Sequence, residues 1–295
     1  MSLSIISKTA KAPVSAPVYG HLVHTDKMEL CLRATNSGNF FDLSDQEQTL
    51  TPRGIYNGVL DKTGIVTKGS GALGGIVVEG VNLSEMREYT AITVIKIDQL
   101  VGSNQALNLW AVGDWSGALQ VAGMGLFGRI DFYNGVWTQR LRGSLWGKNT
   151  DGTLLNAFRE VVLAQQAGVA GVMPNFEHQW MFIVHRISYN PTLTNKWSQS
   201  VIVKSMNLQS TVSSSADFSP EARKQLAVAE GKTLPPALIG SVYSRAHEDS
   251  TDHTIHIKEL RIDSTALTDQ QIEDQYQATK KWLKAEGAVD ISKWV

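Results

Sequence analysis

Short stretches in which hydrophobic and polar residues alternate run through most of this chain, and such alternation is typical of half-buried β-strands. Residues 89–98 read YTAITVIKID, with apolar residues on both faces of the expected strand. A strand that is apolar on both faces is covered on both sides, so we expect residues 89–98 to form a central strand.

Further strands are predicted on the same grounds at residues 75–80, 106–113, 159–166, 180–188, 200–206 and 238–243. Residues 124–143 contain Asn134-Gly135, the strongest short signal for a β-hairpin. Many short strands separated by turns favour a β-sandwich.

The segment from His253 to Trp282 predicts a strand that leads directly into a helix. Ile255 and Ile257 alternate with polar residues, and the alternation resumes one residue out of step at Leu260, which predicts a β-bulge. Thr268, with Gln271 three residues later, is a capping box at the start of the helix, and Leu267 and Ile272 have the spacing of a hydrophobic staple.

The chain divides into an extended N-terminal arm at residues 1–20, a sandwich at 21–283 and a tail at 284–295. Within the sandwich, Ser219-Pro220-Glu221 predicts a helical insertion near residues 219–231, and a closing helix is expected at 268–283. The arm is rich in Ala, Ser, Pro and Lys, so it is either a loose terminus or a segment that docks on a neighbouring subunit.

Three segments resemble the concanavalin A-like, laminin-G-like jelly-roll superfamily. The C-terminal motif of that superfamily is matched by Ile257, Glu259, Leu260, Ile262, Ala266, Leu267, Thr268, Asp269 and Ile272. The piece GNFFDLSDQEQTLTPRG is similar to the opening of many such domains, and EHQWMFIVHR is similar to their Trp-led strand. The resemblance implies an all-β, concanavalin A-like jelly-roll β-sandwich, a fold that serves lectins, glycosidases, adhesion modules and virion parts.

Composition describes a folded globular protein and narrows its partners. The chain has 295 residues, of which 42% are hydrophobic and 19% charged, and its net charge is −1. Without a basic block we expect no nucleic-acid partner, and without a long apolar run we expect no membrane insertion. The N-terminus lacks the apolar core of a signal peptide, and Cys31 is the only cysteine, so synthesis in a reducing cytoplasm is expected.

Catalytic and metal sites are not predicted. Glycosidases of this fold carry alternating acidic residues on one strand, and that pattern is absent, so we expect no enzyme activity. The polar cluster around His247, Asp249, Asp252, His253 and His256 contains metal-ligand types, but a solvated loop explains it better, so we expect no cofactor or metal.

Aromatic residues crowd the region around the predicted hairpin. Exposed aromatic rings stack on sugars, and the candidate glycan contacts are Trp110, Asp114, Trp115, Tyr133, Asn134 and Trp137. The alternative, which we favour for most of these aromatic residues and for Trp146, is that they fill the core or a subunit interface.

Together with the resemblance, these features predict a non-enzymatic bacteriophage virion structural protein, either a capsid decoration protein or a tail component. It would be made in the host cytoplasm, reside in the virion, and assemble with other virion proteins and with itself, as a trimer. The alternatives are a carbohydrate-binding or adhesion module that recognises a cell-surface glycan, and a divergent glycoside hydrolase.

Overall fold

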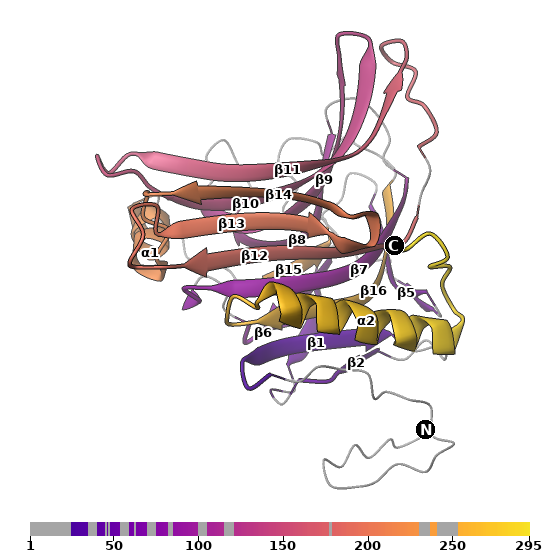
Figure 1. Ribbon diagram of the computed structural model, residues 1–295, viewed down its shortest axis with the longest axis horizontal. Helices are drawn as coiled ribbons and strands as arrows, with labels where there is room; N and C mark the ends of the chain where they lie inside the picture. The colour runs from indigo at the N-terminus through magenta and orange to yellow at the C-terminus, as the bar shows by residue number, and fades with distance from the viewer. Residues whose placement is uncertain are drawn as a thin grey trace, which may run out of the picture.

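The computed structural model shows two antiparallel β-sheets packed face to face, with one long helix on the outside (Figure 1). It describes residues 25–34, 40–44, 46, 48–53, 59–61, 63–69, 75–81, 85–99, 105–114, 121–176, 179–229, 237–240 and 253–295. The predicted arm at residues 1–20 lies outside this part of the chain. The expected all-β sandwich with a C-terminal helix is confirmed.

The first sheet, which we call the helix-side sheet, has the strand order β14-β13-β12-β7-β16-β1-β2, and β4 and β5 join it beside β16. Its strands are β1 (Met28–Ala34), β2 (Phe40–Asp42), β4 (Val59–Asp61), β5 (Gly64–Gly69), β7 (Tyr89–Gln99), β12 (Met181–Tyr189), β13 (Trp197–Val203), β14 (Leu208–Ser214) and β16 (His253–Asp263). As predicted, β7 lies in the middle of its sheet.

The second sheet, which we call the hairpin sheet, has the strand order β11-β10-β9-β8-β15-β6-β3. Its strands are β3 (Thr49–Arg53), β6 (Gly75–Glu79), β8 (Gln105–Asp114), β9 (Val121–Tyr133), β10 (Val136–Lys148), β11 (Leu154–Ala167) and β15 (Ala237–Gly240). The predicted hairpin is present, because β9 and β10 are joined by Asn134-Gly135.

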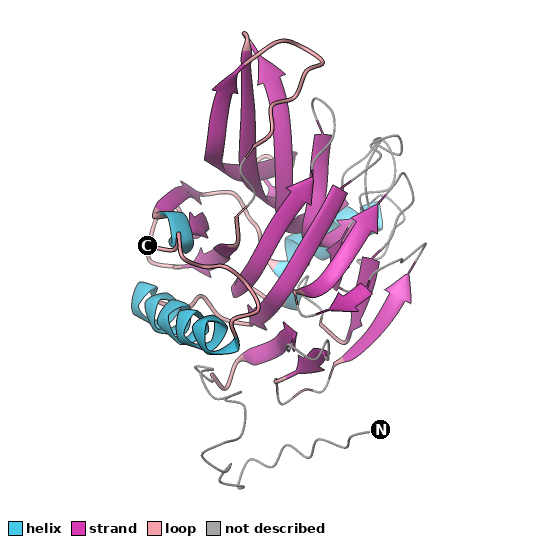
Figure 2. Ribbon diagram, turned by 90° about the vertical axis from the view of Figure 1, so that its right-hand side faces the viewer, coloured by secondary structure: helices cyan, strands magenta, loops and turns pink. Residues whose placement is uncertain are grey.

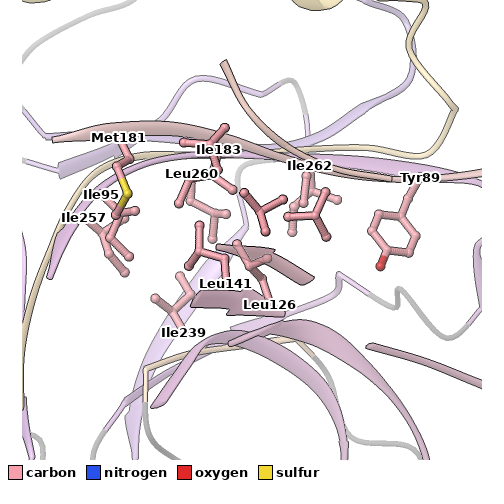
Figure 3. Packing of buried hydrophobic residues seen from close by; sticks show 14 of the residues in the cluster. Tyr89, Ile95, Leu126, Leu141, Met181, Ile183, Ile239, Ile257, Leu260 and Ile262 are labelled. Carbon is pink, nitrogen blue, oxygen red and sulfur yellow. The ribbon is translucent and has the colours of Figure 1, made fainter. Parts of the chain in front are cut away.

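The main core lies between the two sheets (Figure 3). Leu126, Leu141 and Ile239 of the hairpin sheet point toward Ile95 and Ile183 of the helix-side sheet, and all five are almost fully buried. The sheets approach closely at Gly143, where an added Cβ would lie 2.8 Å from His185 Nε2. A residue without a side chain is therefore required at position 143 for this packing.

The predicted bulge in β16 is confirmed, because the pairing of β16 with β7 shifts register between Ile257 and Glu259. Ile257 and Leu260 face the core between the sheets on either side of it. Two consecutive charged residues, Lys258 and Glu259, therefore lie at the bulge, and both contact α2 (Asp269–Glu286) on the outer face of the sheet.

Helix α2 begins with the predicted capping box, in which Gln271 N donates to Thr268 Oγ1 and Thr268 N donates to Gln271 Oε1. Leu267 and Ile272 are both buried in one cluster, as the predicted staple requires. The helix ends at Glu286, three residues beyond the expected end, because Gly287 adopts the left-handed conformation that caps it.

The tail after α2 packs on the body of the protein. Trp294 Nε1 donates to the carbonyl oxygen of Trp180 at 2.9 Å, and the Trp294 ring stacks on Tyr276 of α2. Together α2 and the tail bury Ile92, Val94 and other outward-facing residues of the helix-side sheet in a second apolar cluster. This explains why β7 is apolar on both faces.

Charged residues are buried between α2 and strands β1 and β16. Arg33 Nε donates to Glu259 at 2.8 Å, and Arg261 Nε donates to Asp263 at 2.6 Å. Gln275 of α2 accepts from Arg261, and the guanidinium of Arg33 lies 4.4 Å from the centre of the Trp282 ring. These contacts fix α2 on the sheet through paired charges as well as apolar packing.

The predicted insertion is helix α1 (Pro220–Ala229), with Ser219 Oγ accepting from Ala222 N as its N-cap. The expected end of this helix at Gly231 lies outside the described residues. Arg223 of α1 is buried and donates to the carbonyl oxygen of Met86, which anchors the helix at one end of the sandwich.

Candidate functional site

The outer faces of the two sheets differ in how they are covered. Helix α2 lies outside the strands of the helix-side sheet, at the lower left in Figure 2, and buries much of its outer face. On the hairpin sheet, by contrast, outward-facing residues of β9, β10 and β11 include several that are exposed. The candidate site is therefore on the hairpin sheet.

The tight turn between β9 and β10 determines which side chains reach this outer face. Asn134 and Gly135 both have positive φ, 49° and 77°, as a two-residue type I′ turn requires. The turn pairs Tyr133 with Val136, and alternation then decides the face of every later residue. The outward residues form what we call the β9–β11 face: Arg129, Asp131, Tyr133, Arg140, Arg142, Trp146, Phe158, Glu160 and Val162.

A chain of ion pairs crosses the β9–β11 face from β9 to β11. Arg129 Nε donates to Asp131 Oδ1 at 2.5 Å, and Asp131 Oδ2 lies 3.2 Å from Arg140 Nε. Arg140 then donates to Glu160 Oε2 at 2.8 Å, and Arg142 Nε donates to Glu160 Oε1 at 2.6 Å. Three arginines share two carboxylates, so this series of ion pairs carries a net positive charge. Its guanidinium groups are held in defined positions.

Phe158 lies at the β11 end of this series of ion pairs, and the residue is 45% exposed. The guanidinium carbon of Arg142 is 4.5 Å from the centre of the ring, a cation–π contact that holds one face of the ring. An exposed flat apolar surface thus lies directly beside fixed hydrogen-bond donors and acceptors.

Glu160 remains ionised in this setting. Partial burial raises the pKa of its carboxyl, but hydrogen bonds from Arg140 and Arg142 lower it more, so that the pKa lies below the ordinary value. A glycosidase needs a general acid whose pKa is raised, so Glu160 is unsuited to that role.

Trp146 lies on the same face and is 8% exposed. Its indole Nε1 is buried and has no hydrogen-bond partner among the described residues, which is uncommon for a buried tryptophan. Trp146 is therefore buried, as expected for most of the aromatic residues here. Phe158 provides the exposed ring on this face.

The structure brings together only some of the candidate glycan contacts predicted from the sequence. Tyr133 is 75% exposed at the end of the hairpin, and Asn134 is exposed in the turn beside it. Trp110 and Asp114 belong to β8, but their side chains are outside the described part of the structure, as is all of Trp115. The glycan contacts proposed for these residues stay predictions.

Trp137 requires a correction, because its side chain is fully buried. It packs on Phe132 with ring centres 5.0 Å apart, and its Nε1 donates to the carbonyl oxygen of Val169. An added Cβ at Gly168 would lie 2.8 Å from this indole, so the site is closely packed. Trp137 belongs to the core and offers no face to a ligand.

Sequence reasoning missed Phe158, Arg140, Arg142 and Glu160. The predicted strand began at residue 159, one residue after Phe158, whereas β11 begins at Leu154. The available signal was the alternating Arg140 and Arg142 on β10, which antiparallel pairing places beside Glu160.

No group of three metal ligands occurs among the described residues, which include only His253 and His256 of the polar cluster considered above. His256 Nδ1 lies 2.8 Å from Thr63 Oγ1, and its ring meets Trp180 edge-on. Cys31 is buried, and burial raises the pKa of its thiol, so it is unsuited to act as a nucleophile.

No helix in the described residues is long and apolar enough to span a membrane. No family model and no curated protein matches the sequence.

Comparison with solved structures identifies the fold class. The binding domain of botulinum neurotoxin serotype D matches with a TM-score of 0.50 and 14% identity, over 85% of this chain and 52% of that one. The binding domain of Paraclostridial Mosquitocidal Protein 1 matches with a TM-score of 0.48 and 12% identity, over 87% of this chain and 52% of that one. Trypanosoma rangeli sialidase in complex with 2,3-difluorosialic acid matches with a TM-score of 0.47 and 14% identity, over 88% of this chain and 34% of that one. The chain spans about half the length of the toxin structures, and the first match shows a shared β-sandwich fold.

Proposed function

We propose that this protein is a non-enzymatic carbohydrate-binding module that holds a glycan on the β9–β11 face. The observation that carries the proposal is Phe158, whose exposed ring lies beside Arg140, Arg142 and Glu160. A sugar has an apolar C–H face and a rim of hydroxyls, so it is suited by a flat ring next to fixed polar groups.

Three further features support binding rather than catalysis. The two carboxylates of this face, Asp131 and Glu160, are each held by arginines, and the pKa of Glu160 is lowered. The arginines are held in place before any ligand arrives, which reduces the entropy lost on binding. The solved structure with a TM-score of 0.50 is itself called a binding domain.

A glycan-array screen of the full chain tests this proposal. We expect binding to a defined group of glycans, and we expect the signal to fall to background when Phe158 and Tyr133 are both replaced by Ala. The double variant Leu193→Ala and Val295→Ala is the matched control, since both residues are exposed and lie outside the face. An array without any signal above background for the wild-type protein would contradict the proposal.

The more specific assignment, a bacteriophage virion protein made in the host cytoplasm, remains a prediction from the sequence. It is compatible with glycan binding, because a virion protein can attach to a cell-surface sugar. Immunogold labelling of purified bacteriophage particles with an antibody raised against this protein would test the assignment. Particles without label would contradict it.

A further inference from the structure

Strand β11 is the last strand of the hairpin sheet, and it pairs on one side only, with β10, in the described part of the structure. Figure 1 shows it along the upper border of the molecule, next to β14. Its other side therefore presents backbone N–H and C=O groups that pair with no described strand. Proteins usually protect such an edge with proline, charged side chains or a short strand.

Protection of this kind is incomplete along β11. The segment from Leu154 to Val162 contains no proline, and its two charged residues are Arg159 and Glu160, of which Glu160 is neutralised by Arg140 and Arg142. The segment ends at a bulge where β11 carries one extra residue against β10, between Val162 and Ala164. Three outward residues of this segment are apolar and half-exposed: Leu154 at 42%, Phe158 at 45% and Val162 at 44%.

The residues of this segment are symmetric about Phe158. Every second residue from position 154 to 162 reads Leu154, Asn156, Phe158, Glu160 and Val162, so apolar and polar residues alternate identically in both directions. The symmetry matters because two antiparallel copies of one strand, related by a two-fold axis at its centre, place each residue opposite its mirror position.

We propose that two copies of this chain associate through their β11 edges, as an antiparallel pair with the two-fold axis at Phe158. In this register Leu154 lies opposite Val162 of the second copy, and Glu160 lies opposite Asn156. On the inward side Arg159 lies opposite Ala157, so no two like charges are directly opposed. The paired segment forms on the order of eight to ten backbone hydrogen bonds and extends about 30 Å.

The two registers shifted toward Glu160 are less favourable. A two-fold axis at Glu160 would place two carboxylates opposite each other, and like charges in directly opposed positions are destabilising. An axis midway between Phe158 and Glu160 would oppose the aromatic ring to a carboxylate. The bulge after Val162 also limits pairing to the segment centred on Phe158.

The pairing makes one continuous sheet from two hairpin sheets and brings two β9–β11 faces side by side. The inference does not rest on the proposed function, although Phe158 takes part in both. It replaces the trimer expected from the sequence with a two-fold dimer.

Light scattering coupled to size-exclusion chromatography of the full chain tests the association. We expect a mass of twice the 32.3 kDa of one chain. We expect Phe158→Lys, which opposes two ammonium groups on the axis, to give the mass of one chain with an unchanged circular dichroism spectrum. Leu193→Lys, in the loop between β12 and β13, is the matched control and should remain dimeric. A wild-type monomer at tens of micromolar, or a dimeric Phe158→Lys variant, would overturn the proposal.

Cysteine cross-linking tests the register and does not depend on any variant losing association. Directly opposed residues in an antiparallel pair have Cα atoms about 4.5–5.5 Å apart, within the range of a disulfide. Phe158→Cys should therefore form a disulfide-linked dimer on mild oxidation, and Val162→Cys should not. Native Cys31 is buried and gives no background. Cross-linking of Val162→Cys but not of Phe158→Cys would contradict the proposed register.

Discussion

The guanidinium of Arg142 lies 4.5 Å from the centre of the Phe158 ring and also binds Glu160 through Nε at 2.6 Å. One planar group thus joins an exposed aromatic ring to the ion-pair chain of the β9–β11 face. Lysine has a point charge on a flexible stem and does not reproduce both contacts at once.

The first prediction concerns this residue. Arg142→Lys should keep the fold but weaken glycan binding several-fold, because Phe158 loses the planar group that supports its ring. Isothermal titration with a soluble oligosaccharide identified on the array measures the change. Arg129→Lys, at the far end of the chain of ion pairs, is the control and should lose less affinity. Equal losses in the two variants would contradict this role for Arg142.

The second prediction concerns the charges buried beneath α2. Glu259→Gln leaves the buried guanidinium of Arg33 without its counter-ion, so the free energy of unfolding should fall by about 3–5 kcal/mol. Urea denaturation measures this loss. Glu85→Gln breaks an exposed pair with Lys224 and should change stability by about 1 kcal/mol or less. A Glu259→Gln variant as stable as the wild type would show that the pair does not hold the helix.

The third prediction concerns the helix cap. Thr268→Ala removes the oxygen that accepts from Gln271 N and should lower stability by about 1 kcal/mol. Thr268→Ser keeps that oxygen and should remain close to the wild type. Thermal unfolding of the three proteins compares them directly, and identical midpoints would mean that α2 is fixed by packing alone.

The fourth prediction concerns pH. Burial lowers the pKa of His185 to about 3, and its ring contacts Tyr89 Oη and Gln199 Nε2 in the core. In the unfolded chain an ordinary histidine takes up a proton below about pH 6.5, whereas the folded protein resists protonation to about pH 3. Protons therefore favour the unfolded state, and stability should decrease as pH falls from about 6.5 toward 3.

The test compares urea midpoints at pH 7 and pH 5 for the wild type and His185→Gln. Carboxylates contribute equally to both proteins, so the difference reports His185, and the variant should lose less stability over this interval. Equal losses would contradict a neutral, buried His185.

Much of the local structure was predictable because neighbouring residues determine it. The turn at Asn134-Gly135, the bulge before Glu259 and the capping box at Thr268 each depend on residues close in sequence, and all three are present. Trp137 is a candidate glycan contact on sequence grounds, with the core as the alternative; it is buried because the turn puts it on the same face as Leu141.

The candidate site was not predictable in the same way. The chain of ion pairs depends on which strands lie side by side, and the sequence does not state that β11 pairs with β10 in the register that brings Glu160 to Arg142. The buried pair of Arg33 and Glu259 joins residues that are 226 positions apart. Contacts of this kind follow from the arrangement of the sheets, which no single segment specifies.

The most direct test of the central claim is isothermal titration of one soluble array-identified oligosaccharide into the wild type and into Phe158→Ala. Because Phe158 also lies on the proposed two-fold axis, light scattering of both proteins under the same conditions shows whether association changes, and the affinities are compared for the same oligomeric state. The account predicts at least a tenfold loss of affinity, about 1.4 kcal/mol, with an unchanged melting temperature. Unchanged affinity in Phe158→Ala would contradict the claim that the β9–β11 face binds the glycan.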